Sequence, residues 1–162
     1  MNKKKSQDLI LLDTSFLIAL LNPADAYHAQ AQTWYAFFRE HHSLLFLSSI
    51  ALAEFHAQQQ DLGELAALPV IDFTAEHAQV TGEIWQEHKR RSERTGNPMP
   101  KVLLKDDFKI MAQASCENLN FALTGDSGFL KNLDWLKSVI GKHVDGLDFT
   151  KSNPTEQMGR LF

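Results

Sequence analysis

The sequence predicts a single α/β domain with a mostly parallel central sheet of about four or five strands and helices on both faces. Short, unbroken apolar runs, typical of strands buried on both faces, alternate along the chain with longer segments whose apolar residues recur at helical spacing. Strands separated by helices are typical of βαβ units, which build a parallel sheet. The length of 162 residues suits one domain, and a hydrophobic content of 44% can fill its core.

Four apolar runs are the expected strands. They are Leu9–Leu12, Leu44–Leu47, Pro69–Phe73 and Phe121–Thr124. A further segment, Val144–Phe149, can add a strand at the edge of the sheet. The chain has no internal repeat and no linker long enough to divide it. We therefore expect one domain over residues 1–150 and a polar, frayed tail over residues 151–162.

Helices are expected between these strands. Helical spacing of apolar residues predicts helices over 16–20, 26–40, 50–60, 74–91 and 106–116. Ser48 or Ser49 can cap the third of these helices with a side-chain oxygen. Thr74 and His77 are not expected to form a full capping box, because the third helical position lacks Glu or Gln.

Composition and charge exclude several classes of protein. Cys116 is the only cysteine, which rules out an internal disulfide and a cysteine-based zinc site and fits a reducing cytoplasm. The formal net charge of −4 argues against a protein that coats nucleic acid nonspecifically. The lysines at positions 3–5 and the apolar stretch Leu9–Leu21 after them resemble a signal peptide. Asp13, however, would cost about 3 kcal/mol at the centre of an inserting helix. We therefore expect a cytoplasmic protein.

Four acidic residues from distant segments are expected to meet at one end of the sheet. Asp13 directly follows the first strand, and Asp126 follows the fourth strand by two residues. Glu54 lies within the first two turns of the helix after the second strand, and Asp107 begins the helix before the fourth. Because ligands collect at the carboxyl ends of parallel strands, these carboxylates form the candidate site.

Four converging carboxylates indicate a divalent cation. Like charges in one cleft repel and raise one another's pKa, so an acidic cluster is costly without a counter-charge. Ligation by carboxylates and waters suits Mg²⁺ or Mn²⁺ better than zinc. Such a metal can lower the pKa of a bound water and offset charge on a leaving oxygen, which is the chemistry of a nuclease.

Each acid also has a purely structural interpretation. Asp126 can form a turn or cap a helix. Asp106 and Asp107 can cap a helix and complement its dipole, and for Asp106 this role is favoured. Glu54 can lie on a solvated face. Asp13 fits such an interpretation least, because a carboxylate between two apolar stretches needs a strong compensating partner.

Four segments resemble motifs of the PIN-domain nucleases, and within that family of the VapC-type toxins of bacterial toxin–antitoxin pairs. In chain order, these segments are Leu11–Ser15, Ser48–Phe55, Asp107–Ala114 and Thr124–Phe129. The resemblance runs from about Leu9 to Phe149. Each motif is weak alone, but four in the right order are fairly specific.

The resemblance implies a reaction and a set of residues. The residues that would hold one or two Mg²⁺ or Mn²⁺ ions and cut RNA are Asp13, Glu54, Asp107 and Asp126. Thr14 or Ser15 would support the metal by hydrogen bonding, with Thr124 beside them. The family usually has Asn before the third acid, whereas this chain has Asp106, which leaves open whether Asp106 or Asp107 is the ligand.

A basic strip is expected beside the acids. Between His88 and Lys109 the chain has seven Lys and Arg residues against three acidic ones, whereas the rest is acidic. The expected RNA-binding residues are Lys89, Arg90, Arg91, Arg94, Lys101 and Lys105. Such a strip could follow an RNA backbone while the metal acts on one phosphate. A solvated helix face with ordinary loop charges is the alternative.

The resemblance also implies protein partners. PIN-like domains often pair, and the aromatic segment Ala26–Glu40 could supply the contact of a homodimer. An antitoxin would lay an apolar helix or strand into a groove near the acids. Two alternatives stay open: a PIN-like module that binds RNA or protein without cutting, and a non-toxin PIN nuclease of RNA processing. A haloacid-dehalogenase-like phosphatase is disfavoured because Ser15 stands where a second Asp is needed, and a signalling receiver because Asp72 matches its acceptor only faintly.

Overall fold

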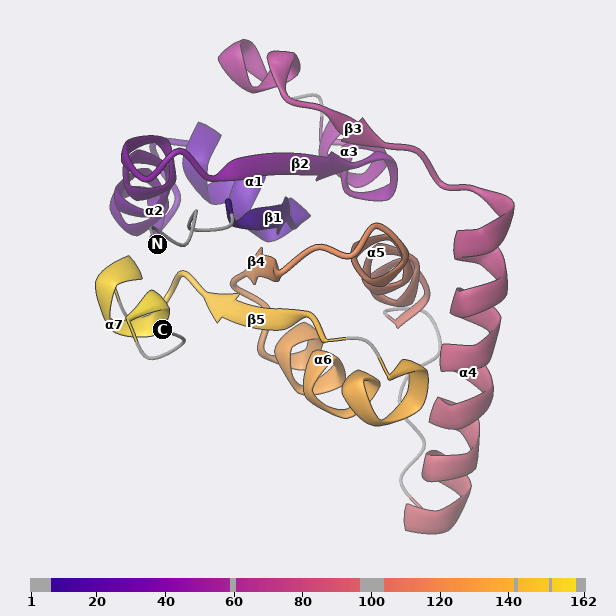
Figure 1. Ribbon diagram of the computed structural model, residues 1–162. Coiled ribbons are helices and arrows are strands. Elements are labelled where there is room, and N and C mark those ends of the chain that lie inside the picture. The colour runs from indigo at the N-terminus through magenta and orange to yellow at the C-terminus, as the bar shows by residue number, and fades with distance from the viewer. Residues whose placement is uncertain (1–6, 59–60, 97–103, 142, 152, 160–162) are drawn as a thin grey trace, which may run out of the picture.

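The computed structural model describes residues 7–58, 61–96, 104–141, 143–151 and 153–159 and contains a five-stranded sheet (Figure 1). The strands are β1 (Leu9–Leu12), β2 (Leu44–Ser48), β3 (Val70–Ile71), β4 (Phe121–Thr124) and β5 (Asp145–Asp148). All pairs are parallel, in the order β3-β2-β1-β4-β5. The expected strands are thus confirmed, although the third is reduced to two residues.

Helices cover both faces of the sheet, as predicted (Figure 1). They are α1 (Thr14–Leu21), α2 (His28–Glu40), α3 (Ser49–His56), α4 (Ala75–Thr95), α5 (Leu104–Cys116), α6 (Ser127–Ile140), α7 (Pro154–Met158) and the 3-10 helix η1 (Gly63–Ala67). None of the helices in these described ranges combines the length and apolar character needed to span a membrane.

The register of the strands brings their carboxyl ends to one rim. Leu12 pairs with Leu47 of β2 and with Leu123 of β4. The backbone N–H of Asp13 extends this ladder by donating to the carbonyl of Leu123 at 3.1 Å. The residues that follow β1, β2 and β4 therefore emerge side by side.

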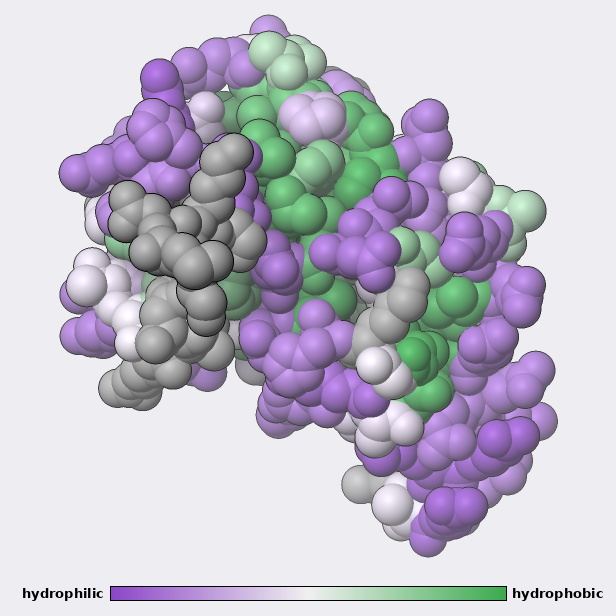
Figure 2. Space-filling view, in the orientation of Figure 1, coloured by the Kyte–Doolittle hydropathy of each residue, from purple (hydrophilic) through white to green (hydrophobic). Residues whose placement is uncertain are grey.

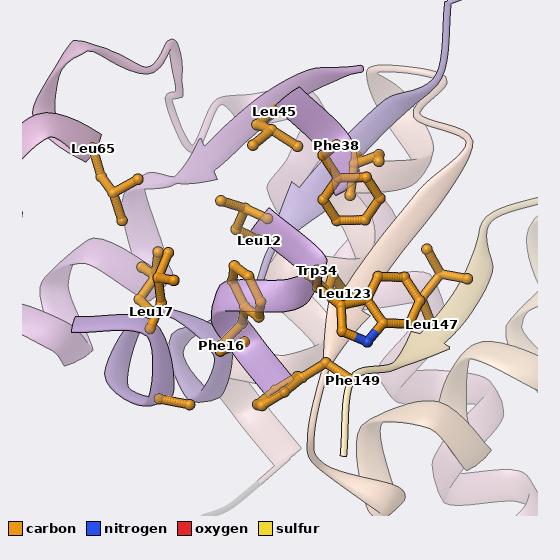
Figure 3. Close-up of a cluster of buried hydrophobic side chains, with 14 of the residues drawn as sticks. Leu12, Phe16, Leu17, Trp34, Phe38, Leu45, Leu65, Leu123, Leu147 and Phe149 are labelled. Atoms are coloured by element: carbon orange, nitrogen blue, oxygen red, sulfur yellow. The ribbon is translucent and has the colours of Figure 1, made fainter. Parts of the chain in front are cut away.

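Each face of the sheet buries its own apolar cluster. Because side chains alternate along a strand, Ile10 and Leu12 of β1 join the cluster with α1 and α2, whereas Leu11 joins the cluster with α4, α5 and α6. Trp34 and Phe38 of α2 are buried in the first cluster, as Figure 3 shows. Burying such a side chain fully contributes about 1.5–3 kcal/mol, so these contacts fix α2 on the sheet.

Helix α4 is longer and better capped than the sequence pattern predicts. The Thr74 side chain accepts from the backbone N–H of His77, and His77 Nδ1 accepts from the backbone N–H of Thr74 at 3.0 Å. This is a full capping box, so the contrary expectation is wrong; an imidazole nitrogen can accept as a Glu or Gln oxygen does. The helix runs to Thr95 instead of Arg91 and ends at Gly96, whose φ of 64° is the left-handed conformation that glycine adopts readily.

Two other boundaries differ from the expectation. Helix α5 begins at Leu104, so Asp106 and Asp107 lie within its first turn instead of at its cap. The segment expected to be a frayed tail contains α7, in which Pro154 and Met158 are buried. Met158 packs into the cluster of α1 and α2, and two buried side chains in so short a helix leave little periodic signal.

Candidate metal centre

Asp13 is the most buried carboxylate at the rim, with 7% of its surface exposed. Its side chain caps α1 by accepting from the backbone N–H of Ser15. Asp13 Oδ2 also accepts from the hydroxyls of Ser15 and Thr124, both at 2.8 Å. Burial raises the pKa of Asp13, and these hydrogen bonds partly offset the rise. The compensating partners that a buried Asp13 requires are thus neutral donors, which hold the carboxyl group in one orientation.

The hydroxyls of Ser15 and Thr124 both donate their protons in hydrogen bonds to Asp13. The Ser15 hydroxyl accepts from the backbone N–H of Gly125, and the Thr124 hydroxyl from that of Asp126, each at 3.0 Å. A hydroxyl has a single proton, so an N–H partner on its acceptor side leaves that proton for the carboxylate. This network connects the end of β1 to the end of β4.

Glu54 reaches the rim from α3, which Ser48 caps with its hydroxyl. The hydroxyl of Thr14 donates a hydrogen bond to Glu54 Oε2. Burial raises the pKa of Glu54; the Thr14 bond lowers it, and the charges of Asp13 and Asp106 raise it further. Glu54 therefore lies close enough to the other acids for their repulsion to act on it.

Asp107 interacts with the whole cluster. Burial is the largest cause of its raised pKa, and the charges of Asp13, Asp126, Glu54 and Asp106 raise it further, to about 7. Charges act so strongly on a carboxyl group only over short distances in a partly desolvated site. Acids from four segments of the chain therefore lie near enough to one another for their charges to act on Asp107.

Asp106 has a neutralising partner of its own. Its Oδ1 lies 2.7 Å from Lys109 Nζ, one turn further along α5. Lys109 also lowers the pKa of Glu54, so its ammonium group lies near the cluster. The two adjacent acids thus differ: Asp106 is paired with a cation, whereas Asp107 is repelled by its neighbours.

Asp126 both caps a helix and takes part in the cluster. Its Oδ1 accepts from two backbone N–H groups in the first turn of α6, at 2.6 and 3.2 Å, which confirms the helix-cap interpretation. Its charge also raises the pKa of Asp107. Gly125 allows the preceding turn to pack tightly, because a Cβ there would lie 2.9 Å from the ring of Phe149.

The chemistry of this donor set fits a hard divalent cation. The cluster offers carboxylate oxygens backed by hydroxyls. Burial raises the pKa of Asp13, Glu54 and Asp107, and the charges of neighbouring acids raise the pKa of Glu54 and Asp107 further. Within the described residues, no three Asp, Glu, His or Cys side chains are close enough together to form a metal site as they stand. Mg²⁺ commonly keeps several waters and needs only one or two direct carboxylates.

A comparison with protein families determines what kind of domain this is. The family model described as the PIN domain matches residues 10–135, a range that includes all four acids. The chain belongs to the PIN-domain family. A comparison with curated protein sequences finds no match.

Solved structures agree with the PIN fold. The chain is similar to VapBC2 from Rickettsia felis bound to a promoter DNA fragment, with 19% identity, a TM-score of 0.53 and coverage of 86% of this chain and 98% of that one. It is similar to VapC20 of Mycobacterium tuberculosis, described as a sarcin-ricin loop cleaving toxin, with 23% identity, a TM-score of 0.54 and coverage of 74% and 92%. It is also similar to FitAcB from Neisseria gonorrhoeae, with 19% identity, a TM-score of 0.58 and coverage of 89% and 100%. At these identities the likeness establishes the fold.

The expected RNA-binding residues of this PIN domain are described in part. Lys89, Arg90, Arg91 and Arg94 lie on the second half of α4. Arg90 and Arg91 both pair with Glu87, at 3.5 and 3.6 Å. Lys101 lies outside the described residues, and only the backbone of Lys105 is described. Because α4 packs along α5, this basic segment adjoins the helix that carries the third acid.

Gln113 is a structural link in the PIN domain that the sequence pattern did not single out. Its side chain is fully buried; Nε2 donates to the carbonyl of Ile71 at 2.7 Å, and Oε1 accepts from the Ser48 hydroxyl at 2.5 Å. Gln113 therefore ties α5 to the cap of α3 and so fixes Glu54 relative to Asp107. A polar side chain on the apolar face of a helix was the available signal, since a buried amide needs partners.

Proposed function

We propose that this PIN domain is a metal-dependent endoribonuclease that hydrolyses RNA phosphodiester bonds. The proposed catalytic residues and metal ligands are Asp13, Glu54, Asp107 and Asp126, with one or two Mg²⁺ or Mn²⁺ ions. The observation that carries the proposal is the convergence of acids from four segments: burial raises the pKa of Asp107, and the charges of Asp13, Asp126 and Glu54 raise it further, to about 7. A bound dication would neutralise these carboxylates, activate a water and offset charge on the leaving oxygen.

The chain's own residues would orient the site before substrate arrives. Ser15 and Thr124 hold Oδ2 of Asp13, and Thr14 holds Oε2 of Glu54. Groups fixed in advance need no reorganisation during the reaction, which is the largest advantage an enzyme site has over water. These three hydroxyls are the proposed supporting residues.

Of the two adjacent acids in α5, we assign the ligand role to Asp107. Asp106 is already paired with Lys109, whereas Asp107 carries the repulsion of the other acids. Asp106 would then hold Lys109 at the edge of the cluster, where an ammonium group can meet a substrate phosphate.

RNA is the proposed substrate. A net charge of −4 and an acidic cluster repel a polynucleotide, so binding needs a local basic surface. The basic second half of α4, next to α5, supports this requirement. The phosphate contacts would orient the strand, while cleavage occurs at the acids.

The proposed biological role is the toxin of a toxin–antitoxin pair. The similar structures are described as a VapBC complex, a FitAB-type complex and a toxin that cleaves the sarcin-ricin loop, which supports an antitoxin partner and RNA as the target. A homodimer that uses the segment Ala26–Glu40 is part of the proposal. A nuclease of RNA processing is the alternative role.

Cleavage of labelled RNA by purified protein tests the activity. Wild type is incubated with Mn²⁺ or Mg²⁺, with and without chelator, beside Asp13→Asn and Asp126→Asn; Asn preserves both helix caps, so neither variant should lose its fold. The matched control is Asp134→Asn, an exposed carboxylate on α6. We expect metal-dependent cleavage by wild type and the control only. RNA binding without cleavage under every condition would instead establish the non-cleaving module.

Expression in a bacterial host tests the biological role. A toxin should arrest growth, Asp13→Asn should not, and the product of an adjacent small gene should restore growth. Metal-dependent cleavage without growth arrest would assign the protein to RNA processing.

A further inference from the structure

A groove of about 390 Å³ lies between the second half of α4 and α6, outside the acidic cluster. Its lining includes His88, Arg91 and Arg94 from α4 and Asn132 and Trp135 from α6. Figure 1 shows α4 as the outermost helix, extending past α6 at its carboxyl end. Figure 2 shows that this end of α4 is covered with hydrophilic side chains.

The centre of the groove is a stack of flat groups. The Arg91 guanidinium lies over the Trp135 ring, 5.0 Å from its centroid, and the His88 ring lies at 29° to Trp135 with 6.2 Å between centroids. Phe108 supports Trp135 and His88 from below with edge contacts. Burial lowers the pKa of His88, which keeps this imidazole neutral at neutral pH. Arg91 thus presents a flat cationic group that lies over an aromatic ring.

Asn132 holds the indole of Trp135 in place in the wall of the groove. It is 3% exposed, and its Oδ1 accepts from the indole N–H of Trp135 at 2.9 Å, which fixes the orientation of the amide. Its Nδ2 has no hydrogen-bond partner among the described residues. The Nδ2 atom is itself buried, so Asn132 acts on the groove through the indole of Trp135 and not as a donor to a ligand.

The charge of the groove favours an anionic ligand. Arg91 and Arg94 both line it, and Arg91 shares Glu87 with Arg90, so Glu87 neutralises neither arginine completely. Trp135 contacts Phe108, the residue after Asp107, which connects the groove to the first turn of α5. The groove therefore adjoins the helix that carries Asp107.

We propose that this groove is a nucleobase subsite, in which one unpaired base of the RNA substrate stacks on the Arg91 guanidinium above Trp135 while Arg94 contacts a phosphate. The proposal rests on the proposed nuclease function and extends it to substrate recognition. Proteins read single-stranded RNA by stacking bases on aromatic rings or guanidinium planes and by hydrogen bonding their edges.

Binding of single-stranded RNA to the full-length protein, measured in the presence of chelator so that nothing is cut, tests the subsite. The probes are a short mixed-sequence RNA and the same strand with abasic sites, which keeps the phosphates and removes the bases. Arg91→Ala should weaken binding of the normal strand by about tenfold, the range of a lost stacked base, and should scarcely affect the abasic strand. Lys131→Ala is the matched control, since it removes one exposed positive charge from α6 outside the groove; we expect less than about a twofold change.

Two further measurements separate stacking from charge. Arg91→Lys keeps the charge and loses the plane, so it should behave as Arg91→Ala; full recovery with Lys would reduce the site to a phosphate contact and overturn the proposal. In the spectrum of the three indole N–H groups, the Trp135 signal, assigned with Trp135→Phe, should shift when a nucleoside monophosphate is added. No shift, or equal binding of normal and abasic RNA, would also overturn it. Cleavage is measured separately, with metal present. A protein that cuts RNA but whose RNA binding does not depend on Arg91 contradicts only the subsite. A protein that passes the binding tests but does not cut RNA contradicts only the proposed nuclease function.

Discussion

Carboxylates at the two ends of the sheet have opposite electrostatic surroundings. At the amino end of β5, Asp145 Oδ1 lies 2.7 Å from Lys137 Nζ and 3.0 Å from His143 Nε2. At the carboxyl ends of the strands, burial raises the pKa of Asp107, and the charges of the surrounding acids raise it further, to about 7. An acid that serves the fold is neutralised within the chain, whereas a cluster left in mutual repulsion is suited to bind a cation.

The largest effect is expected when the same substitution is made at each end. Asp13→Asn should reduce Mn²⁺-dependent RNA cleavage by at least about 100-fold, because it removes a proposed ligand while keeping the cap of α1. Asp145→Asn should leave the cleavage rate within about twofold, because its charge serves an ion pair on the opposite end of the sheet. A similar loss of rate in both variants would mean that the two ends do not differ in function.

Stability should change in opposite directions at the two ends. Asp107→Asn removes repulsion and should raise the free energy of unfolding of the metal-free protein at neutral pH by about 1–2 kcal/mol, a value reduced for its partial exposure. Asp145→Asn breaks partly buried ion pairs and should lower it by about 0.5–1 kcal/mol. Urea unfolding of both variants measures the difference. A loss of stability in both would contradict the assignment of repulsion to the Asp107 cluster.

The cluster should also give the metal-free protein an unusual pH dependence. The folded-state pKa of Asp107, about 7, lies above its ordinary value of 3.8, so between these values the folded state binds more protons than the unfolded state. Stability from this group is therefore highest at low pH and falls as pH rises from about 4 to 7; the raised pKa values of Asp13 and Glu54 act in the same direction. Thermal unfolding with chelator should give a higher Tm at pH about 5 than at pH about 8, and Asp107→Asn should reduce the difference. A Tm that rises steadily toward pH 8 in wild type would contradict this electrostatic account.

Removing the cap of α3 and removing the cap of α4 should have smaller effects, which again differ between the two regions. Ser48→Ala removes the cap of α3 and the bond to Gln113, so it should cost about 1 kcal/mol of stability and lower cleavage several-fold by displacing Glu54. Thr74→Ala removes the cap of α4 and should cost a similar amount of stability without a comparable loss of cleavage. Equal effects on cleavage would show that Ser48 acts only through general stability.

The strands and the order of the acids were predictable because both depend on local pattern. Short apolar runs such as Leu9–Leu12 are typical of buried strands, and in a parallel sheet the residues that follow such strands meet at one rim. The position of Asp13 at this rim was predictable in the same way, since a carboxylate between apolar segments needs a compensating partner.

The features that were missed depend on contacts between elements distant in sequence. Gln113 is significant only because α5 packs against Ser48 and Ile71, which no local pattern reveals. Trp135 gains its guanidinium partner from Arg91 of α4. Met158 is buried only because α7 folds back on α2.

Direct titration of the metal-free protein with Mn²⁺ is the most immediate test of the cluster as a cation site. Calorimetry compares wild type with Asp107→Asn and Asp145→Asn, two variants that each lack one acid, at opposite ends of the sheet. We expect Mn²⁺ to bind wild type and Asp145→Asn alike, with release of protons near pH 7, and to bind Asp107→Asn at least about tenfold more weakly. Equal binding by all three proteins, or no binding by wild type, would contradict the account.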